Sequence, residues 1–174
     1  METTTTYRAP AQTDGAFSRF AALVFFLALP QAAGFVGSLF TRPAIQGWYM
    51  SLEKPWFTPP EIVFPIVWPA LFLMMGIASY LVWKERNRVS AARQGLYLYA
   101  TQLSLNVAWS ILFFGMKSPE AAFYEIIVLI LAVVATTVAF FRSRILAGWL
   151  MVPYILWLLF AALLNYSIWV RNPF

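Results

Sequence analysis

Long uninterrupted runs of apolar residues dominate the chain, and polar residues are concentrated in the short segments between them. A helix rises about 1.5 Å per residue, so about 20 apolar residues cross a hydrocarbon core of about 30 Å. Strands of a membrane barrel would alternate apolar and polar residues, and these runs do not alternate. The pattern predicts an all-α integral membrane protein, a bundle of five transmembrane helices. The expected spans are residues 20–40, 63–83, 95–116, 121–141 and 147–170.

The segments outside these runs complete the expected domain organisation. Residues 1–16 are polar and rich in threonine, which predicts a disordered tail, and residues 17–174 form a single five-helix transmembrane domain. The first connection, residues 42–58, is too long for a simple turn. Its aromatic residues fit either a belt at the level of the lipid headgroups or a lid over a pocket. These aromatic residues are Trp48, Tyr49, Trp56 and Phe57.

Two sequence signals predict helix starts. Thr58 can cap the second span, with Pro59 at its first position and Glu61 completing a capping box. Ser118 and Pro119 repeat this signal before the fourth span.

Composition agrees with a membrane bundle and excludes several kinds of chemistry. Hydrophobic residues make up 61% of the chain and charged residues 11%, against about a quarter charged in soluble domains. The absence of cysteine and histidine excludes disulfides, zinc and iron–sulfur sites, thiol nucleophiles and histidine acid–base catalysis. No metal site and no obligatory cofactor are expected. A bound tetrapyrrole would be held by shape, stacking and hydrogen bonds, or by a weak tyrosine or methionine ligand.

The basic residues indicate topology rather than nucleic-acid binding. With five spans, eight basic residues lie on the side of the N-terminus and four on the other side. The positive-inside rule then places the N-terminus in the cytoplasm and the C-terminus outside. The eight are Arg8, Arg19, Lys84, Arg86, Arg88, Arg93, Arg142 and Arg144, and the four are Arg42, Lys54, Lys117 and Arg171.

Amides and tryptophans form stripes inside the spans. Gln102, Asn106 and Trp109 share one face of the third span because they are four and three residues apart. Trp68 lies about one turn inside the second span. The amides should point into the bundle, either as interhelical hydrogen bonds or as donors in a tryptophan-walled pocket for a flat, largely apolar ligand. A second stripe in the fifth span consists of Tyr154, Trp157, Ala161 and Asn165.

Three other patterns leave their roles open. Glu125 lies within two turns of the start of the fourth span, where it is interfacial or snorkels. The small residues Ala33, Gly34, Gly37 and Ser38 let helices approach closely, within the bundle or at a dimer seam. One segment satisfies a loose cholesterol pattern, but an interfacial aromatic girdle is the favoured interpretation of its residues. That pattern consists of Leu164, Tyr166 and Arg171.

Three motifs resemble those of the tryptophan-rich sensory proteins, the bacterial relatives of the mitochondrial translocator protein or peripheral-type benzodiazepine receptor (TspO/MBR family). The first is Trp48-Tyr49, Leu52, Lys54-Pro55, Pro59-Pro60 and Val67-Trp68. The second is Gln102-Leu103, Leu105-Asn106, Trp109 and Phe113-Phe114-Gly115. The third is Pro153-Tyr154, Trp157, Phe160-Ala161 and Leu164-Asn165-Tyr166. The resemblance runs from about residue 20 to the C-terminus.

The resemblance implies a five-helix bundle, commonly a homodimer, that binds porphyrins such as protoporphyrin IX or haem and benzodiazepine-type ligands. Animal members also bind cholesterol, through a motif that maps to Leu164, Tyr166 and Arg171. Some bacterial members break down protoporphyrin in light, with tryptophans matching Trp68 and Trp157. The implied pocket residues are Trp48, Trp68, Gln102, Asn106, Trp109, Tyr154, Trp157 and Ala161.

The chain departs from the family pattern near the first loop. A family tryptophan is Phe57 here, and positions that are often arginine and tryptophan are Glu61 and Ile62. The leading hypothesis is a tetrapyrrole-binding sensor or regulator in a bacterial membrane. The alternatives are a light-dependent protoporphyrin-degrading enzyme and a transporter of tetrapyrroles or sterols. The transporter is weakened because this chain has no good candidate for a titratable group at the middle of a span, which proton-coupled transport usually needs.

Overall fold

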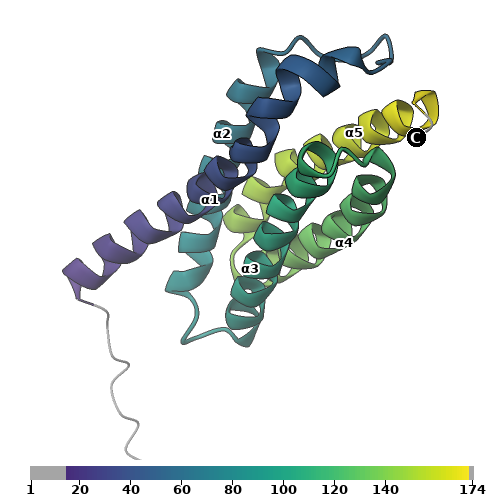
Figure 1. The fold of residues 1–174 in the computed structure, drawn as a ribbon. Coiled ribbons are helices and arrows are strands. Elements are labelled where there is room, and N and C mark those ends of the chain that lie inside the picture. Colours follow the sequence, from purple (N-terminus) through teal and green to yellow (C-terminus); the bar gives the residue numbers. More distant parts are fainter. Residues whose placement is uncertain (1–14, 173–174) are drawn as a thin grey trace, which may run out of the picture.

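The computed structural model describes residues 15–172, and this part of the chain is helical with no strand (Figure 1). Two of the helices continue into a short π-helical segment, so the described chain forms five helical rods. The all-α prediction is confirmed. The elements are α1 (Ala16–Ala44), η1 (Ile45–Tyr49), α2 (Val63–Lys84), α3 (Ser90–Ser110), η2 (Ile111–Gly115), α4 (Pro119–Ser143) and α5 (Ile145–Arg171).

Four of these rods are long and apolar enough to cross a membrane. They are Ala16–Tyr49, Val63–Lys84, Pro119–Ser143 and Ile145–Arg171. The rod α3 is long enough but too polar to qualify, because its first turns and its inner face carry charged and amide side chains such as Arg93, Gln94 and Gln102. The predicted tail lies outside the described residues up to residue 14, and α1 already begins at Ala16.

The helices form a ring in which chain neighbours are not always spatial neighbours. The α4 rod packs along both α3 and α5, α2 packs against α1 and α5, and α1 completes the ring against α3 (Figure 1). The N-terminal turns of α1 diverge from the other helices, and Phe17 and Phe20 are largely exposed there. The outward faces of the four apolar rods carry many exposed hydrophobic side chains, so the ring buries mainly its inner side against protein.

Small residues set the closest helix contacts of α1. A Cβ atom at Gly76 of α2 would lie 2.7 Å from the carbonyl oxygen of Phe26. Gly34 packs against the ring of Phe72, and a Cβ atom at Gly37 would lie 2.9 Å from Oγ of Ser110. The small residues of α1 therefore serve packing within the bundle, which settles one of the alternatives left open by the sequence.

The first connection is shorter than predicted, because the helix does not stop at residue 40. It runs through Ala44 into η1, so Trp48 and Tyr49 lie on a helical extension and only residues 52–62 are irregular. The capping box is wrong. The backbone N–H and hydroxyl of Thr58 both donate to the carbonyl oxygen of Pro55, at 3.0 and 2.7 Å, and form a turn instead. The α2 helix begins at Val63 without a side-chain cap.

The start of the fourth helix is as predicted. Oγ of Ser118 accepts a hydrogen bond from the backbone N–H of Ala121 at 3.3 Å, and Pro119 occupies the first turn. This cap satisfies one of the backbone donors that have no partner within the helix itself.

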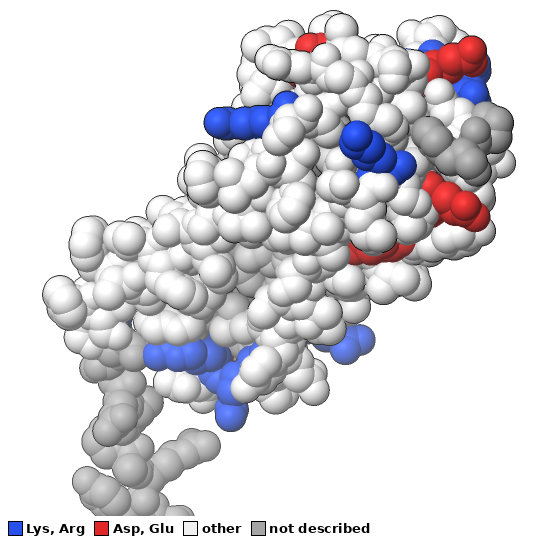
Figure 2. Space-filling model, viewed as in Figure 1, with Lys and Arg blue, Asp and Glu red and all other residues white. Residues whose placement is uncertain are grey.

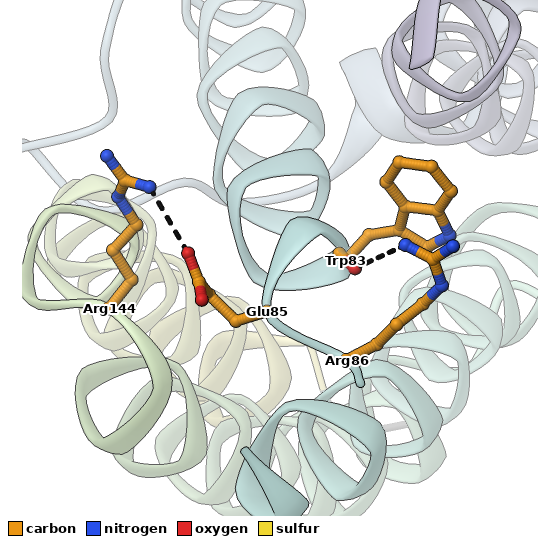
Figure 3. A network of polar contacts seen from close by, with 4 residues as sticks. All are labelled: Trp83, Glu85, Arg86 and Arg144. Atoms are coloured by element: carbon orange, nitrogen blue, oxygen red, sulfur yellow. Dashed lines mark hydrogen bonds and ion pairs between the residues drawn. The ribbon is translucent and has the colours of Figure 1, made fainter. Parts of the chain in front are cut away.

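On the face shown in Figure 2, acidic and basic residues lie at the upper end of the bundle, basic residues lie at the lower end, and the region between them is largely uncharged. At the end formed by the α2–α3 and α4–α5 connections, Nη1 of Arg144 lies 3.5 Å from Oε1 of Glu85. In Figure 3, Arg86 donates to the carbonyl oxygen of Trp83 at 2.9 Å and its guanidinium lies 3.7 Å from the centroid of the indole ring. Such aromatic and basic residues are typical of a membrane–water interface.

Candidate functional site

A cavity of about 960 Å³ lies between α1, α2, α3 and α5, beneath the irregular residues 52–62. Its size falls within the range of about 300–1,000 Å³ that is usual for small-molecule sites. The walls are mostly apolar and aromatic. Each of the four helices contributes side chains, so the shape of the cavity depends on how the helices pack.

Aromatic rings give the cavity rigid walls. Trp68 of α2 lies with its ring centroid 5.4 Å from that of Phe72. Trp109 of α3 stacks on Phe113 at 5.1 Å, and Trp157 of α5 meets Phe64 edge-on at 5.9 Å. Each tryptophan of the wall is therefore supported by a second ring, which limits its rotamers and leaves flat surfaces for a flat ligand.

Several polar groups on the wall bond across helices. Nδ2 of Asn106 donates to the hydroxyl of Tyr154 at 2.9 Å. Nε1 of Trp109 donates to Oδ1 of Asn165 at 3.0 Å, and Nδ2 of Asn165 donates to the carbonyl oxygen of Pro119 at 2.7 Å. Nε1 of Trp157 is buried without a hydrogen-bond partner among residues 15–172. This indole N–H is therefore unsatisfied, and it is covered by protein rather than exposed to the cavity.

Five of the eight predicted pocket residues line the cavity: Trp68, Asn106, Trp109, Trp157 and Ala161.

The other three lie behind the wall or beside it. Gln102 is fully buried one turn deeper, with Nε2 3.8 Å from Sδ of Met75. Tyr154 is fully buried and positions Asn106 from behind. The ring of Trp48 packs against Phe113 at 5.7 Å.

The residues of the cholesterol pattern do not share one site. Leu164 is buried and lines the cavity. Tyr166 points away from it and joins an outer aromatic group with Phe123 and Trp169, at 5.2 and 6.1 Å between ring centroids. Arg171 is exposed at the end of α5. Tyr166 therefore has the surroundings of a girdle residue.

Several residues that line the cavity were not among the predicted pocket residues. Tyr49, Phe113 and Phe114 line the wall from the π-helical segments, which widen the helix and redirect side chains at the loop end of the cavity. The Phe113-Phe114-Gly115 motif was a usable signal for two of them. Glu125 also differs from expectation, because both of its carboxylate oxygens are buried without a hydrogen-bond partner in the described chain.

The irregular residues over the cavity are tied to the end of α5. Oδ1 of Asn172 accepts a hydrogen bond from the backbone N–H of Glu53 at 2.9 Å, and Nδ2 of Asn172 donates to the carbonyl oxygen of Glu53 at 3.0 Å. This pair of bonds, here called the Asn172 latch, joins residues 119 positions apart. It holds the first connection down over the cavity.

Comparison with known proteins agrees with this geometry. The profile of the TspO/MBR family matches residues 26–170. The tryptophan-rich protein TspO of Chlorobaculum tepidum is 43% identical over 155 residues, which cover 87% of this chain and 96% of the relative. The human translocator protein is 41% identical over 148 residues, 84% and 88% of the two chains. The tryptophan-rich sensory protein of Cereibacter sphaeroides is 40% identical over 120 residues, 69% and 73% of the two chains.

The apolar helices and the cavity together define a helical integral membrane protein with a ligand-sized aromatic pocket. Within that class, the chain belongs to the TspO/MBR family.

Proposed function

We propose that the protein binds porphyrins or related tetrapyrroles inside the membrane and acts as a sensor or regulator of a tetrapyrrole or stress response. The observation that carries the proposal is the cavity of about 960 Å³ with Trp68, Trp109 and Trp157 on its wall. A macrocycle is flat, largely apolar and polar at its edge, which matches stacked rings with a few donors. Benzodiazepine-type and sterol-like molecules share part of this shape.

In this proposal, Trp68 and Trp157 flank the macrocycle, while the amide of Asn106 bonds to its polar edge. The name of the Cereibacter sphaeroides relative, a sensory protein, supports the sensor role. No cofactor is needed for binding itself.

We further propose that α3 also crosses the membrane, which brings the number of transmembrane spans to five, and that this membrane is bacterial. Its amides Gln102 and Asn106 are buried toward the core and the cavity, and the hydroxyls of Thr101 and Ser104 bond to carbonyl oxygens of their own helix. The N-terminus would lie in the cytoplasm and the C-terminus outside, since eight of the twelve basic residues lie on the side of the N-terminus when the chain has five spans. The homodimer implied by the resemblance remains a prediction.

The first prediction tests the binding site. Titrating protoporphyrin IX into the detergent-solubilised protein should quench tryptophan fluorescence saturably. In a Trp68→Phe/Trp157→Phe variant, and in Asn106→Ala, we expect affinity to fall by about tenfold, the equivalent of about 1.4 kcal/mol in lost stacking or hydrogen bonding.

Trp149→Phe is the matched control for this titration, because Trp149 lies on α5 but is 61% exposed on the outer surface. It should bind like the wild type. Equal affinity in the wild type and both cavity variants would reject this site.

The second prediction concerns the Asn172 latch. Replacing Asn172 by alanine removes both bonds to Glu53. At a net value of about 0.5–1.5 kcal/mol for each hydrogen bond, the first connection should open about tenfold more often. Stopped-flow mixing with protoporphyrin IX should therefore show faster association and faster dissociation, with a smaller change in Kd.

Ser51→Ala is the control, since its hydroxyl bonds only locally to the carbonyl oxygen of Trp48 at 2.8 Å. Rates that stay unchanged in Asn172→Ala would mean that the first connection does not limit entry.

A further inference from the structure

The charged side chains on the cavity wall all lie at its loop end. Of the residues that line it, only Arg42, Lys54 and Glu61 are charged. Everything deeper is apolar, aromatic or a neutral polar group. A ligand that fills this cavity therefore meets flat rings below and charges above, so it must be an amphipathic molecule oriented along the cavity.

The two cations come from different elements. Arg42 lies in the last turn of α1 and is exposed. Lys54 follows the latched residue Glu53 and is half-buried, with Nζ 4.6 Å from the ring centroid of Tyr49 and 4.0 Å from Sδ of Met50.

Neither cation is neutralised by a carboxylate. Within residues 15–172, no ion pair involves Arg42 or Lys54, whereas Arg144 at the opposite end of the bundle lies against Glu85. Lys54 is held by an aromatic face and a thioether, which leaves its positive charge available to an anion. At the mouth of the cavity these two unpaired cations outnumber the one carboxylate, Glu61, and so favour an anionic group at the edge of the ligand.

We propose that Arg42 and Lys54 form an anion-recognition subsite at the mouth of the cavity, and that its ligand is a flat acid with at least one carboxylate. The inference rests on the proposed function and narrows it to tetrapyrrole acids. The planar guanidinium of Arg42 can bind a carboxylate through two parallel hydrogen bonds, and the ammonium of Lys54 adds a second charge. The rings of the ligand then point down between Trp68 and Trp157, and its acid groups point up to the first connection.

Glu61 should determine on which side of the mouth the ligand carboxylate binds. It lines the same end of the cavity just before α2, so it repels a carboxylate that approaches from that side. The acid groups should therefore settle toward α1 and Lys54. Removing the charge of Glu61 should strengthen the binding of an acid, the opposite sign to removing Arg42 or Lys54.

The experiment compares protoporphyrin IX with its dimethyl ester, which keeps the macrocycle and loses both charges. Each is titrated into the wild type, Arg42→Gln, Lys54→Gln, their double variant and Glu61→Gln. We expect the acid to bind the wild type about tenfold more tightly than the ester, and each cation variant to lose most of that preference. Glu61→Gln should raise the affinity for the acid about threefold. A higher salt concentration should weaken the binding of the acid and leave the binding of the ester unchanged.

Lys117→Gln is the matched control, because Lys117 is an exposed cation at the same end of the bundle that does not line the cavity. It should bind both compounds like the wild type. Equal binding of acid and ester by the wild type, with saturation, would overturn the subsite and leave the proposed function intact. If neither compound binds saturably, the proposed function fails and the subsite fails with it.

A lipid phosphate is the other source of an anion at this position. Adding lysophosphatidylglycerol to the titration should leave the affinity for protoporphyrin IX unchanged within about twofold. Strong competition that disappears in the double variant would assign the cation pair to lipid headgroups and overturn the carboxylate assignment.

Discussion

Replacing Asn165 by leucine is expected to lower the free energy of unfolding by about 2–3 kcal/mol and to weaken tetrapyrrole binding. Asn165 is 1% exposed and joins three helices, since it accepts from Trp109 of α3 and donates to Pro119 at the start of α4. Leucine has the same branching and number of side-chain heavy atoms, is somewhat larger, and leaves the indole N–H without an acceptor. Denaturant titration in detergent measures the stability, and the protoporphyrin titration measures the binding.

A double-mutant cycle gives this prediction its sharpest form. Trp109→Phe removes the donor that Asn165→Leu leaves unpaired, so the two losses should not add, and the shortfall should be about 1 kcal/mol. Ser104→Ala is the control on α3, because its exposed hydroxyl bonds only to Ala100 of its own helix. Strict additivity would show that the hydrogen bond between the two residues contributes nothing.

Replacing Gly76 by alanine is expected to destabilise the protein by about 2–3 kcal/mol, although alanine is the better helix former. The added methyl group would lie 2.7 Å from the carbonyl oxygen of Phe26 and 3.0 Å from Cα of Leu27. Both are backbone atoms, so relief requires α1 and α2 to separate. Because the cavity lies between these helices, its shape should change as well.

Gly47→Ala is the control, and its expected effect on stability is opposite in sign to that of Gly76→Ala. Nothing lies within 4 Å of a Cβ atom at Gly47, which is in the helical segment η1. Alanine there should be neutral or stabilise by up to about 1 kcal/mol through its helix propensity. A Gly76→Ala variant as stable as the wild type would mean that α1 moves freely against α2.

Hydrophobic runs were a good guide to the helices and a poorer guide to their ends. The runs predict where a helix can be buried in lipid, but α1 and η1 continue to Tyr49 because Arg42 and Gln46 are compatible with helix at an interface. Thr58 was misassigned since a threonine before proline also forms a turn, and here the carbonyl oxygen of Pro55 takes both of its donors.

Spacing predicted the face of each polar stripe but not its depth. Gln102, Asn106 and Trp109 do share one face, yet Met75 covers Gln102 while Asn106 reaches the cavity. That difference depends on which residues of α2 lie opposite, and a single helix carries no information about this. The charges on the cavity wall were missed for the same reason, because Arg42 and Lys54 line one cavity only after α1 has packed against the rest.

The Asn172 latch also fixes an order of events during biosynthesis. Translation delivers the N-terminal part first, and at roughly 5–20 residues per second the 119 residues between the latch partners take roughly 6–24 s. Throughout that interval, the first connection has nothing to fasten it, and α5, one wall of the cavity, is missing or incomplete. During part of that interval, Trp68 and Trp109 are already present without the wall that α5 supplies, so the future cavity is open on that side.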